Sequence, residues 1–135
     1  MELINNMLTS LLHTFRVVHS VIREHSKLIT RSSKWGSVRK AALLANPACS
    51  CCGSTERLQV HHCVPYHLRP ELELEPKNLI VLCMSKNECH LLVGHSRKGF
   101  KWYNPYVMAD LMNIQAGSVT LQEAHILAEK QALPN

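Results

Sequence analysis

Aromatic side chains are scarce in this sequence, since Phe, Trp and Tyr together make up 5% of its 135 residues. Aromatic residues usually supply much of the surface that a small core buries. The length excludes a multidomain enzyme, and 46% apolar with 19% charged residues excludes a disordered tail or a fibre. The composition therefore predicts one ordinary soluble domain, with or without an appendage, that something besides aromatic packing holds together.

Long apolar runs, internal repeats and low-complexity segments are also lacking. The first ten residues contain no Lys or Arg, and the apolar stretch after them is interrupted by His13, Arg16 and His19. Neither a secretion signal nor a membrane span has this pattern. The sequence therefore predicts a cytoplasmic protein with reduced thiols and no membrane partner.

Cysteine and histidine are abundant, with six and nine residues respectively. In a reducing compartment, Cys-x-x-Cys accompanied by further Cys and His indicates zinc more often than disulfides. The segment Cys49-Ser50-Cys51-Cys52-Gly53 has the form of a zinc knuckle, with a glycine directly after the second ligand. We therefore predict that a structural zinc ion provides the missing stabilisation.

The positive charge is concentrated in the first half of the chain. Residues 1–60 hold eight Lys or Arg against three Glu, whereas residues 61–135 hold seven against seven acidic residues. The densest part is residues 23–40, with Arg23, Lys27, Arg31, Lys34, Arg39 and Lys40 against Glu24. This segment is suited to a polyanion such as nucleic acid, or it is a solvated helix face without a ligand.

The N-terminal segment, residues 1–30, is predicted to form an amphipathic helix. Its apolar residues repeat at spacings of four and three, at Ile4, Leu8, Leu11, Phe15, Val18, Ile22 and Ile29. Such a stripe either packs on its own domain or forms a seam with a second copy or a protein partner.

Periodicity and turn signals divide the remaining chain into short elements. Helices are predicted at residues 34–45, 89–93, 106–114 and 120–130, and strands at 58–64 and 79–83, with a long loop at 65–77. Asn46-Pro47 ends the first helix, and Thr120-Leu121-Gln122-Glu123 has the form of a capping box at the start of the last.

Four short motifs in this order resemble the HNH endonuclease family. They are Cys49-x-x-Cys52, His61-His62, Asn78 with the strand up to Cys83, and Cys89-His90. The resemblance covers about residues 35–106 and is closest to the compact HNH proteins of phages and prophages. It implies an α+β protein with a ββα-metal (His-Me finger) core, a DNA substrate and a bacterial or phage-infected cell.

The resemblance also assigns roles to the histidines. It implies that His62 is the general base, that His61 and His90 hold a divalent metal, and that Asn78 steadies the base. Adjacent strand residues point to opposite faces, so His61 and His62 can serve one site only if the strand bends or ends there. The family's third ligand is usually at i+4, which is Gly94 here, whereas His95 is at i+5. We expect His95 to bind the metal if the helix ends at Gly94, which favours a left-handed end, and otherwise to hydrogen-bond a phosphate.

Two metals follow from these assignments. Cys49, Cys52, Cys83 and Cys89 are expected to hold a structural Zn²⁺, although Cys51 could compete for a ligand position and Cys63 has the character of a small buried apolar residue. The histidine site would hold the catalytic divalent metal, Mn²⁺, Ni²⁺, Mg²⁺ or Zn²⁺. Its all-imidazole set should bind Mg²⁺ comparatively weakly.

Basic residues on both sides of the motif are candidates for DNA backbone contacts. Arg97, Lys98 and Lys101 follow His95, while Arg39 and Lys40 precede the knuckle. Phosphate contacts of this kind position a nucleic acid without reading its sequence. The alternative is plain surface charge.

The sequence thus predicts an N-terminal helix (1–30), an HNH nuclease domain (31–115) and a C-terminal helix (116–135). The expected activity is metal-dependent DNA hydrolysis that leaves 5′-phosphate and 3′-hydroxyl ends. Two alternatives remain: a zinc-stapled DNA-binding or scaffold module without activity, and a nuclease subunit of a larger nucleic-acid-processing complex.

Overall fold

A computed structural model describes residues 14, 16–18, 20–21 and 30–134 of the chain. The chain divides into two compact units, Met1–Arg31 and Ser32–Asn135. In the first unit the described residues 14, 16–18 and 20–21 are helical. Of the predicted apolar stripe only Val18 is among them, and the other six positions lie outside the described residues. The packing or docking role of this segment therefore stays a prediction.

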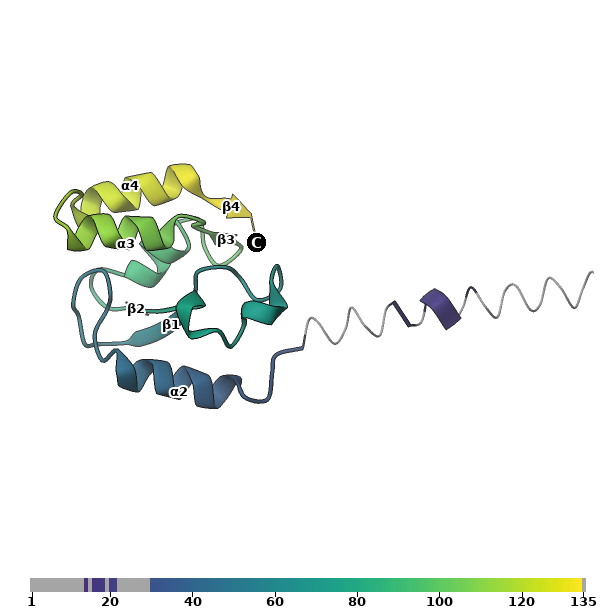
Figure 1. The fold of residues 1–135 in the computed structure, drawn as a ribbon. Helices are drawn as coiled ribbons and strands as arrows, with labels where there is room; N and C mark the ends of the chain where they lie inside the picture. Colours follow the sequence, from purple (N-terminus) through teal and green to yellow (C-terminus); the bar gives the residue numbers. More distant parts are fainter. Residues whose placement is uncertain (1–13, 15, 19, 22–29, 135) are drawn as a thin grey trace, which may run out of the picture. The chain divides into compact units, whose positions relative to one another are not determined.

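The second unit is a small mixed structure of helices and two short antiparallel sheets (Figure 1). Its elements are α2 (Trp35–Ala45), β1 (Leu58–His62), η1 (Pro70–Leu72), η2 (Pro76–Asn78), β2 (Leu79–Cys83), η3 (His90–Gly94), β3 (Trp102–Tyr103), α3 (Val107–Gln115), α4 (Leu121–Gln131) and β4 (Leu133–Pro134). The predicted strand at 79–83 is confirmed residue for residue, and the predicted helices lie within about two residues of those observed. The pair of short strands β3 and β4 was not expected.

Strands β1 and β2 form the antiparallel pair on which the site is built. Their register places Leu58 opposite Cys83 and His62 opposite Leu79. Four of the five residues of β2 are buried, as its uninterrupted apolar run predicts. Strand β1 ends at His62, two residues earlier than expected and just before the turn that contains Pro65.

The core is made of aliphatic and cysteine side chains. Leu82, Val93, Val107 and Leu111 are its main members, together with the buried cysteines. Among the described residues, no Phe, Trp or Tyr belongs to the buried core. This agrees with the scarcity of aromatics in the sequence and leaves the cysteine cluster in a central position.

Helices α3 and α4 pack together and cover η3. Helix α4 begins with the predicted capping box, in which the Thr120 side chain accepts from the Glu123 N–H and the Glu123 carboxylate accepts from the Thr120 N–H. Its buried face is Ala124 and Ala128, and the small side chains allow close approach to η3. The C-terminal helix is thus part of the same unit as the cysteine and histidine motifs.

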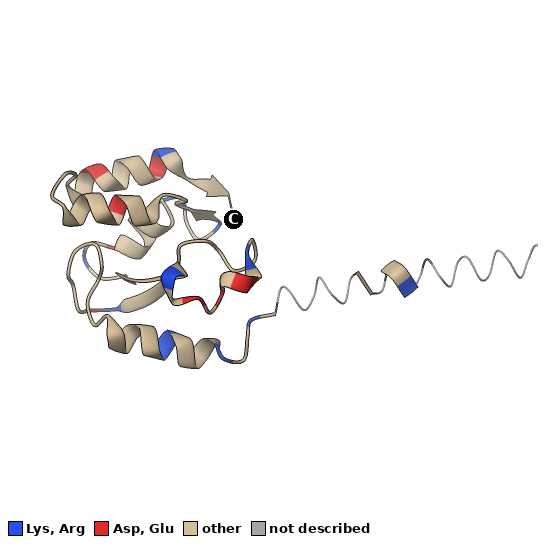
Figure 2. Cartoon of the chain, in the orientation of Figure 1, with Lys and Arg blue, Asp and Glu red and all other residues tan. Residues whose placement is uncertain are grey.

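Charge is distributed unevenly over this second unit (Figure 2). Helices α3 and α4 carry Asp110, Glu123 and Glu129 against a single Lys130. Lysines and arginines are found on α2 and on the loops, and the loop between β1 and β2 also carries Glu71, Glu73 and Glu75. Within the described residues, no helix is long and apolar enough to cross a membrane.

Candidate metal centres and the adjoining histidine

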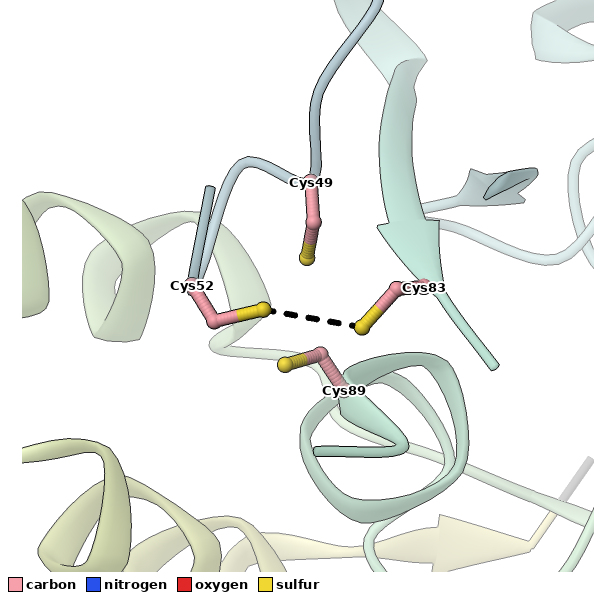
Figure 3. Close-up of side chains that lie close together, drawn as sticks. All are labelled: Cys49, Cys52, Cys83 and Cys89. Atoms are coloured by element: carbon pink, nitrogen blue, oxygen red, sulfur yellow. Dashed lines mark hydrogen bonds between the residues drawn. The ribbon is translucent and has the colours of Figure 1, made fainter. Parts of the chain in front are cut away.

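Four cysteines from three parts of the second unit form one cluster. Cys49 and Cys52 come from the turn before β1, Cys83 ends β2, and Cys89 directly precedes η3. Their sulfur atoms lie within 4.8 Å of one another and face a common centre (Figure 3). The Cys52 and Cys83 Sγ atoms are 3.6 Å apart, close to the edge of about 3.8 Å of a tetrahedron with Zn–S bonds of about 2.3 Å. The cluster could hold a metal ion such as zinc.

The knuckle turn is held by backbone hydrogen bonds. The Cys49 N–H donates to the Ser54 carbonyl, and the Gly53 N–H donates to the Cys49 carbonyl. Gly53 has φ +74°, a conformation that favours glycine. The Ser50 N–H donates to the Val81 carbonyl over 2.9 Å, which fastens the turn to β2 and brings the first two cysteines to the last two.

Two cysteines are not members of this set of four: Cys51, which contacts it, and Cys63. None of the six forms a disulfide. Cys51 is half-buried, and hydrogen bonds from the Cys51 and Cys89 thiols lower the pKa of the Cys49 thiol. Cys63 is buried, and burial raises the pKa of its thiol to about 11. Cys63 therefore behaves as the small buried residue that was expected.

Three histidines form a second cluster. His61 comes from β1, His90 begins η3, and His95 follows η3. Their ring centroids are 4.9 to 5.1 Å apart, and one nitrogen of each lies within 4.8 Å of the others. Burial and the neighbouring imidazoles hold the pKa of His61 well below its usual range, and the same causes lower the pKa of His90 to about 4. Burial also lowers the pKa of His95. All three are thus neutral near pH 7, as metal binding requires.

Hydrogen bonds select the ring nitrogen that each histidine offers. His90 Nδ1–H donates to Gln59 Oε1 over 2.8 Å, and His95 Nδ1–H donates to the Trp102 carbonyl over 2.6 Å. Both rings therefore keep the lone pair on Nε2. The Nε2 atom of His61 is buried without a hydrogen-bond partner. Three neutral imidazoles, one with an orphaned buried nitrogen, fit a divalent cation.

A π-helical turn explains how His95 joins His90 although it is five residues away. The His95 N–H donates to the His90 carbonyl over 3.0 Å, which is the i to i+5 bond of a π-helix. The wider turn brings position i+5 to the face that i+4 occupies in an α-helix. The helical turn ends at Gly94 as predicted, but the left-handed conformation expected there is wrong, since the left-handed residues are Ser96 and Arg97, both with φ +58°.

Gly94 is required for a different reason. A Cβ atom at this position would lie 3.0 Å from Cε1, 3.1 Å from Nδ1 and 3.2 Å from Nε2 of the His61 ring. These distances are shorter than ordinary van der Waals contact. The absence of a side chain at position 94 therefore makes room for the His61 imidazole, and any larger residue at this position would displace it.

His62 lies outside the three-histidine group. Its Nε2–H donates to the Glu73 carbonyl over 2.9 Å, so the neutral ring keeps its basic lone pair on Nδ1. The ring stacks on Trp35 of α2, with centroids 4.6 Å apart. His61 and His62 are adjacent in β1, and successive strand residues point to opposite faces. Strand β1 ends at His62, but the two rings have different neighbours, so their service in one site stays a prediction.

Asn78 fastens the loop after β1 to the start of β2. Its Oδ1 accepts from the Val64 N–H over 2.8 Å, and its Nδ2 donates to the carbonyls of Val64 and Leu72 over 3.0 and 3.1 Å. Leu72 directly precedes Glu73, whose carbonyl orients the His62 ring. Asn78 thus positions the loop that holds His62, which is the kind of contact that the sequence predicted.

The predicted DNA-contacting residues are all exposed. Arg97, Lys98 and Lys101 lie in the loop between η3 and β3, and Arg39 and Lys40 lie on α2. Arg39 is one helical turn after Trp35, which contacts His62. Exposed basic side chains therefore lie in the loop that follows His95 and on the helix that contacts His62.

Several residues of the site were missed from the sequence. Gln59 could have been found, because a strand places residues i and i+2 on one face and Gln59 precedes His61 by two. The carbonyls of Glu73 and Trp102 act through the backbone and leave no signal in residue type. Phe100, whose ring contacts His90 and His95, was also overlooked.

Comparisons with known proteins found no match to this chain among family models, curated proteins or solved structures.

Proposed function

We propose that this protein is a metal-dependent DNA endonuclease of the HNH type, with η3 and the β1–β2 pair as its ββα-metal core. The observation that carries the proposal is the pairing of His61 and His62. One belongs to a buried group of three neutral imidazoles, and the next residue is a histidine whose Nε2 is held by a carbonyl. The order of the motifs supports the same assignment.

The chemistry needs a base and a stabilised leaving group. His62 Nδ1 takes a proton from the attacking water, and the Glu73 carbonyl stabilises the imidazolium that forms through the Nε2–H bond. When bound at the three histidines, a divalent cation would offset the charge that develops on the phosphate and the 3′ oxygen. Water attack at phosphorus with departure of the 3′ oxygen leaves 5′-phosphate and 3′-hydroxyl ends.

The other parts of the site hold this arrangement in place. Zinc in the four-cysteine cluster would clamp the end of β2 to the start of η3 and so fix His90. Asn78 keeps the loop that presents the Glu73 carbonyl. Arg97, Lys98, Lys101, Arg39 and Lys40 attract the DNA backbone without regard to sequence.

The ligand set favours particular cations. Every member of the group is an imidazole, and imidazole suits Zn²⁺, Ni²⁺ and Mn²⁺ better than it suits Mg²⁺. We therefore expect Mg²⁺ alone to support the weakest cleavage. Tight binding of Zn²⁺ need not coincide with the highest turnover, so the working metal is to be found by a metal panel.

The test is plasmid cleavage by purified protein with Mn²⁺, Ni²⁺, Mg²⁺ and Zn²⁺ supplied separately. His62→Ala should abolish cleavage in every metal, while His67→Ala, which alters an exposed histidine in the same loop, should not. Unchanged circular dichroism and zinc content would show that His62→Ala is folded. Cleavage that survives His62→Ala would overturn the proposal, and DNA binding by wild type without cleavage in any metal would indicate the DNA-binding module instead.

A further inference from the structure

Phe100 is an exposed aromatic residue at the edge of the histidine group. Its side chain is 58% exposed, and its ring centroid lies 4.7 Å from that of His95 and 5.8 Å from that of His90. The turn that carries it is defined by Gly99, with φ +90°, and by a bond from the Trp102 N–H to the Gly99 carbonyl. The fold thus presents a large apolar ring to solvent beside the candidate metal site.

The neighbours of Phe100 are cationic. Arg97, Lys98 and Lys101 are exposed and belong to the same loop. Lys98 Nζ lies 4.7 Å from the ring centroid of Trp102, which is half-buried in β3. Phe100, which contacts the rings of His90 and His95, is the more exposed aromatic side chain of this segment.

An aromatic ring among cations is the combination that binds single-stranded nucleic acid. The cations contact the phosphates, and the aromatic face stacks on a base. In a continuous duplex both faces of each base are covered by its neighbours. A ring at the protein surface can therefore stack fully only on a base that is unpaired and unstacked.

We propose that Phe100 stacks on an unpaired base next to the phosphate that is cut, and that the site acts on single-stranded segments of DNA. This inference rests on the proposed function for the position of the phosphate. It goes further because it names the form of the substrate and the residue that selects it. Gapped, flapped or single-stranded DNA should be bound and cut in preference to intact duplex.

The test measures binding of a fluorescent single strand and of the same sequence as a blunt duplex, by anisotropy, in a His62→Ala background that keeps the substrate intact. Phe100→Ala should weaken single-strand binding about 5- to 150-fold. Phe100→Leu should weaken single-strand binding to a similar extent, whereas Phe100→Trp should retain it. Duplex affinity should change by less than about twofold, since phosphate contacts dominate there.

Tyr106→Ala is the matched control, because Tyr106 is an aromatic residue of almost equal exposure, 56%, at the start of α3. It should leave both affinities unchanged. The inference is overturned if Phe100→Ala binds the single strand as tightly as the protein that retains Phe100. It is also overturned if Phe100→Ala reduces the affinity for duplex by the same factor as the affinity for single strand, or if the protein with Phe100 does not bind single strands at low salt.

A second measurement separates this inference from the proposed function. In protein that retains His62, the substitution Phe100→Ala should reduce the cleavage of a gapped duplex more than the cleavage of an intact duplex. Cleavage that depends on His62 but not on Phe100 would overturn the stacking role alone. Cleavage that survives His62→Ala would overturn the nuclease assignment, while a selective loss of single-strand binding in Phe100→Ala would still support the stacking role.

Discussion

The substitution Gly94→Ala tests the geometry of the histidine group most directly. The added Cβ would lie 3.0 to 3.2 Å from three atoms of one His61 ring, so rotation of that ring about its own axis does not relieve the contact. Restoring an ordinary separation requires a displacement of about 0.4 Å. His61 is 3% exposed and has little free space in which to move.

The expected effect is larger on metal binding than on folding. A displacement of about 0.4 Å exceeds the tolerance of about 0.2 Å in metal–ligand distances. We expect the affinity of the three histidines for Ni²⁺ or Co²⁺ to fall about 10- to 100-fold, the loss typical of disturbed ligand orientation. Overpacking of a buried site should lower the free energy of unfolding by about 1–3 kcal/mol.

The assay is calorimetric titration of zinc-loaded protein with Ni²⁺, followed by urea unfolding. Gly36→Ala is the matched control, since a Cβ on this residue of α2 meets nothing within 4 Å. It should keep metal affinity unchanged and raise the free energy of unfolding by up to about 1 kcal/mol. Gly94→His, which creates a histidine at i+4, should bind Ni²⁺ no more tightly than wild type. Wild-type affinity in Gly94→Ala would refute the close contact as the reason for glycine.

Three further predictions concern the cysteine cluster, the acid sensitivity and the loop clamp. Cys89→Ser should lose the bound zinc in native mass spectrometry, whereas Cys63→Ser should retain it, and equal zinc content in the two variants would contradict the four-cysteine site. Because the pKa of His90 is lowered to about 4, the unfolded chain binds more protons as pH falls below about 6.5, so stability is lost on acidification. Between pH 7 and pH 5, metal-free wild type should therefore lose about 2 kcal/mol more than His90→Gln in urea unfolding, and parallel pH profiles would contradict this. Asn78→Ala removes three hydrogen bonds from a buried side chain and should lower the free energy of unfolding by about 2–4 kcal/mol, and a loss below about 1 kcal/mol would show that the clamp is dispensable.

Local pattern was sufficient for much of the fold. The apolar run of β2, the capping box of α4 and the Asn46-Pro47 helix end depend on neighbours in sequence, and each was predicted to within a residue or two. The groups of four cysteines and three histidines were also expected, and the structure brings each group together. These sets followed from the resemblance to the HNH family, since their members come from segments about thirty positions apart.

Other features depend on contacts between distant segments and could not be predicted. The pairing of β3 with β4 joins two-residue strands that are about thirty positions apart, too short to show any period. The π-helical turn has no residue signature of its own. The last residue of this turn is Gly94, and the His61 ring occupies the space that a side chain at position 94 would need. The orientation of His62 is set by a backbone carbonyl, which every residue possesses.

The sequence by itself determined which residues could bind a metal, because thiolates and imidazoles are recognised by residue type. Only the tertiary structure decided how these residues are presented. It turned His95 onto the face of His90 and left Phe100 exposed among cations beside them. The physical reason is that ligand identity belongs to a side chain, whereas ring orientation, tautomer and exposure are set by the atoms that packing brings around it.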